Sequence, residues 1–281
     1  MIKKIGLFFL CFPLVMFVIE TLFFIIGWHV NCFAFIFAFI LVIGYILRNT
    51  SKKIRLKSIC WFVGITLASI FIGANVYDAS YDGQWYHSSI IKLMNDGWNP
   101  FYHPILQQDE VPYYTNTHIW VSHYAKGMET IEAGIVALTG NLESGKTLNI
   151  FLAISLFCFV FDFIGNFNKL DKGIIRFLVA LTTTLNPVLV NQMMTHYIDY
   201  TCYVFVTIGL VYVYNIVVKK ERSYMLPLLL MGFFVPTINS IFPNCFSVIF
   251  STCTSPSAGL FFLIFSTIAS AIVEFCASLQ Y

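Results

Sequence analysis

The sequence predicts an all-α polytopic membrane protein, a single transmembrane domain over residues 1–281 with about eight transmembrane helices and one large external loop containing short amphipathic helices. Three observations predict this class: the composition, the length of the apolar runs and the distribution of basic residues. The chain is 58% hydrophobic and only 11% charged, whereas soluble domains are about 25% charged. So little charge cannot cover a water-facing surface, and we expect no nucleic-acid partner.

Apolar runs of about 20 residues, long enough to cross roughly 30 Å of hydrocarbon, set the positions of the predicted helices. They are 5–27, 30–47, 58–76, 147–165, 174–191, 200–218, 224–242 and 258–276. The stretch after residue 222 is unusual, because it is rich in Ser, Cys and Phe and is interrupted at 254–259. It is consistent with two further spans or with an aberrant or truncated end.

The basic residues favour one orientation of these helices. Lys and Arg that flank a span resist translocation, so cytoplasmic loops are enriched in them. With a cytoplasmic N-terminus, only Lys92, Lys126 and Lys146 of the 16 basic residues fall on the outer side. All 6 His and most of the 14 acids fall there too. We therefore expect an integral membrane protein in which segment 77–146 is an external loop that carries the candidate active site.

Residues 140–147 match the phosphate-binding pattern GxxxxGK[ST] of nucleotide-binding proteins. That site needs a strand before it and a soluble helix after it. Residues 128–138 instead place apolar side chains at helical spacing, with Glu129 and Glu132 off that face, which predicts an amphipathic helix. A membrane span follows. We interpret the glycines as a turn ahead of that span and expect no ATP partner.

Two acids stand at the start of the external loop. Asp78 and Asp82 are four residues apart, and so share one side of a helix or of an extended segment. A carboxylate here can act as a general base on a hydroxyl nucleophile, and a pair can bind a divalent cation. The alternative is a solvated turn, with Asp82 preceding Gly83. A possible divalent cation on this pair is the only cofactor that the sequence suggests.

The loop continues with Trp85-Tyr86-His87, a predicted short helix through 90–93, and Gly97-Trp98-Asn99-Pro100-Phe101. A span followed by an acid and these aromatics resembles the first external loop of the GT-C superfamily. These polytopic glycosyltransferases include protein O-mannosyltransferases and lipid A aminoarabinose transferases. The resemblance covers roughly residues 58–215. It departs from the family in having Gly83 where a second acid is usual, in an additional hairpin before the loop, and in an early end of the chain.

The resemblance implies a membrane glycosyltransferase that moves a hexose or pentose from a polyprenyl-phosphate donor to a hydroxyl of a lipid, glycan or protein acceptor. The transfer would take place on the outer face of the membrane, with inversion at the sugar carbon. Asp82 matches the family's presumed catalytic acid and would be the general base, with Asp78 as the second catalytic candidate. The family's distribution suggests a bacterial inner (plasma) membrane. The substrate-binding candidates are His87, Lys92, Trp98, His103, His123, Lys126, His196 and Asp199.

The aromatic residues of the loop have two interpretations. Trp85, Trp98, Tyr102 and Trp120 can stack on sugar rings, or they can anchor the loop at the membrane interface, where Trp and Tyr are enriched. The second interpretation needs no ligand and is favoured by the sequence alone.

Two other functions fit the same sequence. An envelope polysaccharide transporter, flippase or polymerase would also need acids and aromatics in a wet cavity, but with its essential charges at mid-membrane depth. A non-catalytic membrane subunit or a truncated remnant would account for the unusual C-terminal stretch. The depth of the Asp82 carboxylate relative to the bilayer separates the first alternative from a glycosyltransferase.

Overall fold

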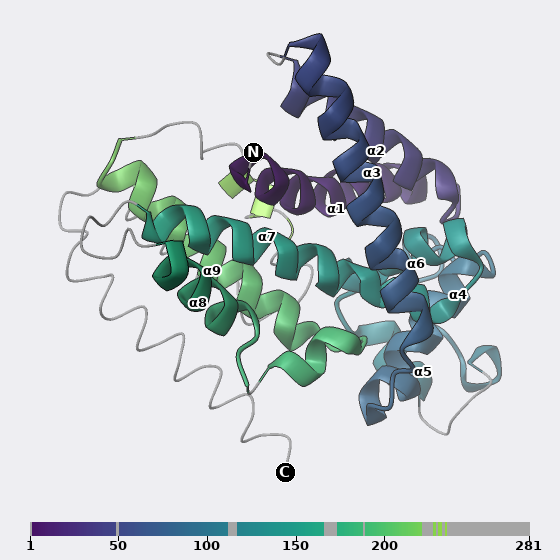
Figure 1. Cartoon of the computed structure of the whole chain (residues 1–281). Helices are drawn as coiled ribbons and strands as arrows, with labels where there is room; N and C mark the ends of the chain where they lie inside the picture. The colour runs from purple at the N-terminus through teal and green to yellow at the C-terminus, as the bar shows by residue number, and fades with distance from the viewer. Residues whose placement is uncertain are drawn as a thin grey trace.

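A computed structural model describes residues 2–48, 51–111, 117–165, 173–187 and 189–220, with 227, 228, 230, 231 and 234 in addition. Every regular element within these residues is helical (Figure 1), as the predicted all-α class requires. The α-helices are α1 (Ile2–Ile25), α2 (Cys32–Leu47), α3 (Lys52–Asn75), α4 (Ser88–Asn95), α5 (Thr117–His123), α6 (Gly127–Thr139), α7 (Thr147–Ile164), α8 (Gly173–Thr184) and α9 (Ile198–Val217). The shorter π or 3₁₀ turns are η1 (Gly83–His87), η2 (Gln108–Glu110), η3 (Leu142–Lys146) and η4 (Val190–Met194).

Four helical segments of the described residues are long and apolar enough to cross a membrane. They are Ile2–Ile25, Ile54–Asn75, Leu142–Ile164 and Ile198–Val217. Each overlaps a predicted span, and α2 and α8 are apolar but shorter. The predicted span 258–276 and most of 224–242 lie outside the described residues. The long apolar helices indicate a membrane protein, and the total of about eight spans stays a prediction.

The predicted span 174–191 is wrong at its C-terminal end. α8 ends at Thr184, shortly before Asn186 and Pro187. The residue before a proline is disfavoured in the helical conformation, so helices tend to end there. The 12 residues of α8 rise about 18 Å at 1.5 Å per residue, which is less than the roughly 30 Å of a hydrocarbon core.

The core is built on α1, which packs against α2 and α7, while α7 also packs against α8 and α9. Phenylalanines fill it: the ring of Phe8 stacks on Phe62 of α3 at a centroid distance of 4.6 Å. Gly6 lets α7 approach α1 closely, because a Cβ there would lie 2.9 Å from the Cβ of Cys158. Small residues at such contacts allow helices to pack together in a membrane, where the hydrophobic effect does not drive association.

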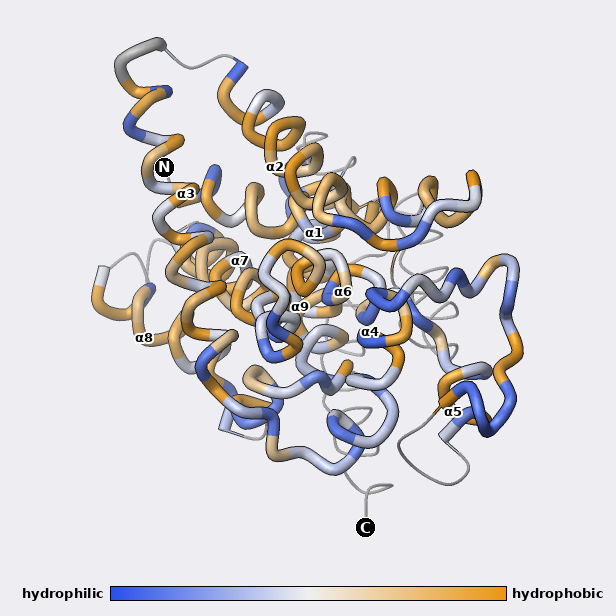
Figure 2. Tube along the Cα trace, turned by 90° about the vertical axis from the view of Figure 1, so that its right-hand side faces the viewer, coloured by the Kyte–Doolittle hydropathy of each residue, from blue (hydrophilic) through white to orange (hydrophobic). Residues whose placement is uncertain are grey.

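Segment 77–146 folds against one end of these helices, where Figure 1 shows α4, α5 and α6 together. Side-chain amides attach it. Asn99 Nδ2 donates to the Phe24 carbonyl in the last turn of α1 at 2.9 Å, and Asn141 Nδ2 donates to the Ala74 carbonyl near the end of α3 at 3.1 Å. Figure 2 shows hydrophobic residues along α1, α2, α7 and α8 and hydrophilic residues concentrated around α4 and α5.

The opposite helix ends carry basic residues. These are Lys4 at the start of α1, Arg48 after α2, Lys57 in α3, Arg176 in α8 and Lys219 after α9. The helices therefore alternate in direction, with a polar, acidic end at segment 77–146 and a basic end opposite it.

Candidate functional site

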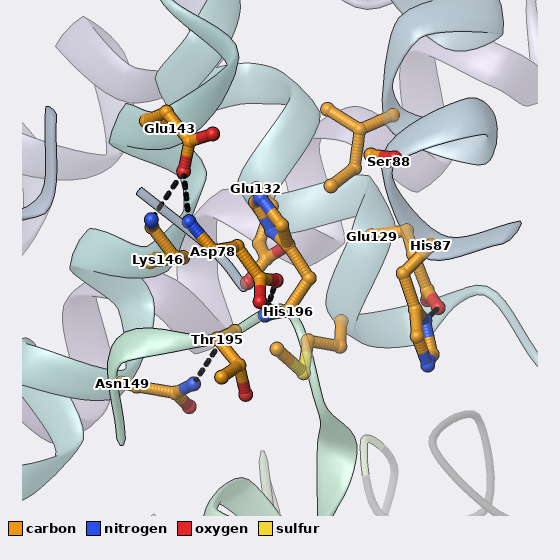
Figure 3. Close-up of polar contacts among 12 residues, drawn as sticks. Asp78, His87, Ser88, Glu129, Glu132, Glu143, Lys146, Asn149, Thr195 and His196 are labelled. Carbon is orange, nitrogen blue, oxygen red and sulfur yellow. Dashed lines mark hydrogen bonds and ion pairs between the residues drawn. The ribbon is translucent and has the colours of Figure 1, made fainter. Parts of the chain in front are cut away.

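Asp78 is a buried anchor directly after α3. It is 2% exposed, and its Oδ1 accepts hydrogen bonds from the backbone N and Oγ of Ser80 at 2.8 and 2.6 Å. Its Oδ2 accepts from the backbone N of His196 at 2.8 Å (Figure 3). Gly83 leaves room for this arrangement, because a Cβ there would lie 2.2 Å from Asp78 Oδ2. Oδ1 therefore fixes the turn after α3, and Oδ2 joins that turn to the segment before α9.

A buried lysine holds the glycine-containing turn after α6. Gly140 ends α6 in the left-handed conformation, with φ +70°, which glycine adopts without strain. η3 then leads directly into α7, so the interpretation of these glycines as a turn is confirmed. The Nζ of Lys146, fully buried, donates to the Glu143 carboxylate and to the Val76 carbonyl. Glu143 also accepts from the backbone N of Asp78 at 3.0 Å (Figure 3).

Two His–Glu pairs meet on α6. The Nδ1 of His87 lies 2.5 Å from Glu129 Oε1, and the Nδ1 of His196 lies 2.7 Å from Glu132 Oε2. All four side chains are buried. The predicted helix is confirmed, but its polar face is covered by the two histidines and not by water. Buried charges require partners of this kind, so α6 acts as a central support for the polar groups (Figure 3).

The pair between Glu132 and His196 is electrostatically coupled. Burial raises the pKa of Glu132, and the neighbouring His196 only partly offsets this. Burial acts to lower the pKa of His196, but Glu132 outweighs that effect and the pKa is raised. Glu132 Oε1 and His196 Nε2 are buried without a hydrogen-bond partner among the described residues. Unpartnered buried polar atoms destabilise a fold, so native proteins contain few of them.

Asp82 has an environment unlike that of Asp78. It is half-buried, and its backbone N donates to the Tyr197 hydroxyl at 3.3 Å, while its carboxylate makes no hydrogen bond with the described residues. Burial raises the pKa of Asp82, and the charge of nearby His87 lowers it. The π-helical turn η1 starts at the next residue, and such turns are frequent at functional sites. Of the two candidate catalytic acids, Asp82 therefore has the available carboxylate.

Two cavities adjoin the chain around Asp82. The polar cavity, of about 280 Å³, is lined among others by Asp78, Ser88, Ser89, Lys92, Glu143 and His196. The aromatic cavity, of about 220 Å³, is lined by Ala79, Ser80, Tyr81, Gln84 and Trp85. Gln84 lines both cavities, and Gly83 lines the polar one. Asp82 itself lines neither cavity, but its two neighbours in sequence line one each.

Several predicted substrate-binding residues lie in this region. Lys92 and His196 line the polar cavity, and His87 is close enough to Asp82 for their charges to interact. Asp199, in the first turn of α9, accepts a hydrogen bond from Gln192 Nε2 at 2.9 Å. It also lies within electrostatic range of Asp82 and His87.

The other predicted residues hold the loop together. Trp98 is buried, and its Nε1 donates to the His103 carbonyl at 2.8 Å. The Nζ of Lys126 lies 5.6 Å from the centroid of the Trp98 ring, and burial lowers the pKa of this lysine. The His103 ring contacts exposed Glu110 at 2.8 Å. His123 is exposed, and none of these residues lines either cavity.

The sequence reasoning missed the supporting residues Glu129, Glu132, Glu143 and Lys146. The only local signal was the spacing of Glu129 and Glu132, three residues apart on one predicted helix. Among the described residues, no three His, Cys, Asp or Glu side chains are grouped as a metal ion requires. A divalent cation on Asp78 and Asp82 therefore stays a prediction.

No protein-family model, curated protein or solved structure matches this chain. The geometry of the site is therefore the basis for assigning a function.

Proposed function

We propose that this chain is a membrane glycosyltransferase that moves a sugar from a polyprenyl-phosphate donor to an acceptor hydroxyl, with Asp82 as the general base. One observation carries the proposal. The Asp82 carboxylate makes no hydrogen bond with the described residues, and its neighbours in sequence line two different cavities. A transferase must hold two substrates on either side of its reacting atoms. Asp78, the second catalytic candidate, becomes a positioning residue, because both of its oxygens are occupied.

The polar cavity suits the donor sugar. Its hydroxyl, ammonium and carboxylate groups match the hydroxyls of a sugar. Its volume of about 280 Å³ lies just below the range of roughly 300–1,000 Å³ for small-molecule sites, as suits a single sugar. Tyr77 lines this cavity and follows α3 directly. Leu67 and Phe71 on α3 are 61% and 69% exposed, so an isoprenoid tail can lie along α3 in the lipid while its sugar enters the cavity.

The reaction follows from this arrangement. The acceptor oxygen attacks the anomeric carbon from the face opposite the phosphate, and its proton passes to the Asp82 carboxylate. As the new carbon–oxygen bond forms, the bond from the anomeric carbon to the phosphate oxygen breaks and that oxygen keeps the electron pair. Polyprenyl phosphate leaves and the sugar carbon is inverted. Lys92 offsets the charge of the leaving phosphate, and His87 favours the ionised form of Asp82.

The position of the proposed base and its two neighbouring histidines favours surface chemistry over transport. Asp82, His87 and His196 lie outside the four candidate spans, whereas a transporter or flippase would need its essential charges at mid-membrane depth. The basic residues at the opposite helix ends favour a cytoplasmic location for those ends. We therefore propose that the site faces the outside of a bacterial inner membrane.

The test is sugar transfer by the purified full-length protein in lipid nanodiscs, supplied with radiolabelled polyprenyl-phosphate hexoses and pentoses together with lipid, glycan and peptide acceptors. Asp82→Asn should lower the release of polyprenyl phosphate by about 100- to 10,000-fold, the usual contribution of a general base. Asp109→Asn, at an exposed acid of the same loop, should leave the release unchanged. Full activity in Asp82→Asn, or no release by the wild type with any donor, would contradict the proposal.

A further inference from the structure

An aromatic cluster lies beside Asp82 and is not used by the mechanism above. It consists of Tyr81, Trp85, Tyr86, Trp120 and Tyr124. Trp85 is at its centre, with ring centroids 5.5 Å from Tyr81, 5.9 Å from Tyr86 and 5.9 Å from Trp120. The cluster joins two stretches of the loop segment, the turn η1 with its preceding residues and α5 with the residue after it.

The structure distinguishes this cluster from the other loop aromatics. Trp98 is buried and fixes its own loop through a backbone carbonyl. Tyr81 and Trp120, by contrast, are 74% and 40% exposed. Trp85 Nε1 donates to the hydroxyl of buried Thr117 at 2.8 Å, which holds the indole in one orientation. The cluster thus combines a fixed ring with accessible ones.

The aromatic cavity beside this cluster contains polar groups as well as rings. Ser80 and Gln84 line it together with Tyr81 and Trp85. Gln84 Nε2 donates to the Asp78 carbonyl at 2.7 Å, which leaves its Oε1 as an acceptor. The hydroxyl of Ser80 donates to Asp78 and keeps its lone pairs. Ring faces together with a few fixed acceptors form a lining that a polyhydroxylated ring can match with both C–H and O–H groups.

We infer that the aromatic cavity and its cluster bind a carbohydrate ring, and that the acceptor of this enzyme is therefore a glycan or glycolipid. The role of the bound sugar as an acceptor rests on the proposed function. Carbohydrate binding itself does not depend on transfer. Tyr81 and Trp85 flank Asp82 in the chain, so a sugar held on them presents its hydroxyls close to the general base. Insertion of the cluster into lipid is the rival explanation, and the neighbouring Asp82 and Gln84 oppose it, because polar and charged groups are costly in hydrocarbon.

The experiment measures glycan binding by the full-length protein in nanodiscs, first on an array of defined oligosaccharides and then by saturation-transfer NMR with the best-bound free glycan. Tyr81→Ala combined with Trp120→Ala should weaken binding by about tenfold or more, equivalent to about 1.4 kcal/mol. Tyr81→Phe should retain most of it. Trp28→Ala, which removes a 54% exposed Trp from the turn after α1, should leave it unchanged.

The outcomes separate this inference from the proposed function. Glycan binding that Asp82→Asn retains and that the double variant loses supports a carbohydrate site even if no transfer is seen. Binding to no glycan on the array, or equal binding by the double variant, overturns the inference. It is also overturned if the double variant changes only the thermal stability or membrane insertion of the protein. Asp82-dependent transfer to a non-carbohydrate acceptor would leave the proposed function standing and exclude a glycan acceptor.

Discussion

At the scale of single residues, Asp78 and Asp82 show how two similar acids acquire different roles. Both follow α3, and their spacing in sequence suggests a matched pair. Ser80 and the His196 backbone occupy both oxygens of Asp78, whereas the Asp82 carboxylate lacks such partners. The sequence predicts that catalytic acids lie in this region. However, the group that occupies Asp78 Oδ2 is 118 residues away, so no local pattern identifies which acid is available.

The pH dependence of transfer should depend on His87. The pKa of Asp82 is raised by burial and lowered by the charge of His87. A general base must be ionised, so activity should rise with pH through the pKa of Asp82. His87→Gln removes the lowering effect and should move the acidic limb of the pH–kcat/KM profile to higher pH. The profile of each purified variant, recorded in nanodiscs, measures this shift.

A second histidine variant provides the control for this measurement. His103 is exposed and paired with Glu110. The acidic limb of the His103→Gln profile should therefore lie at the same pH as that of the wild type. If the limb of His87→Gln stays in place or moves to lower pH, His87 does not act on Asp82 through its charge.

At the scale of elements, α6 and η1 explain why the site could be predicted only in part. Apolar spacing predicts α6 correctly, because a helix is a local structure. The same pattern places Glu129 and Glu132 off the apolar face, and it does not predict that both are buried. Their partners His87 and His196 lie 42 and 64 residues away, so the tertiary fold and not local spacing buries them.

Glu132→Ala should destabilise the protein strongly. It removes one member of a buried pair and leaves His196 without its partner, which typically costs about 3–5 kcal/mol. Glu110→Ala is the matched control, because it breaks a Glu–His contact at the surface, where such pairs contribute little. Thermal unfolding of both variants in the same detergent compares them. Equal midpoints for the two variants would contradict a supporting role for Glu132.

Gly83→Ala should disturb the start of η1. An added Cβ would lie 2.2 Å from Asp78 Oδ2 and 2.3 Å from Ser80 Oγ, so Asp78 must shift, at a cost of about 1–3 kcal/mol for such overpacking. Gly64→Ala in α3 is the control, since nothing lies within 4 Å of its added Cβ and alanine favours a helix by about 1 kcal/mol. Unfolding midpoints should fall for the first variant only. A midpoint for Gly83→Ala at or above that of the wild type would refute the close contact.

At the scale of the whole molecule, hydropathy correctly predicts the helices that are defined by their length and apolar composition. α1, α3, α7 and α9 are long runs that a local window detects, since crossing the hydrocarbon requires little else. α8 is shorter than predicted because Pro187 disfavours the helical conformation of the residue before it. The site arises where helix ends meet, at the end of α3 and the starts of α7 and α9. Hydropathy predicts which ends are polar, but the contacts between them depend on packing.

The orientation of the whole molecule in the membrane can be tested by labelling its two ends. The polar end carries Lys92 and the opposite end carries Lys219, and both residues are exposed. In a background without other reactive cysteines, Lys92→Cys should react with a membrane-impermeant maleimide in intact cells. Lys219→Cys should react only after the membrane is permeabilised, because basic helix ends stay in the cytoplasm. The reverse labelling pattern would put Asp82 on the cytoplasmic side, away from an outer-face donor, and would exclude the proposed direction of sugar transfer.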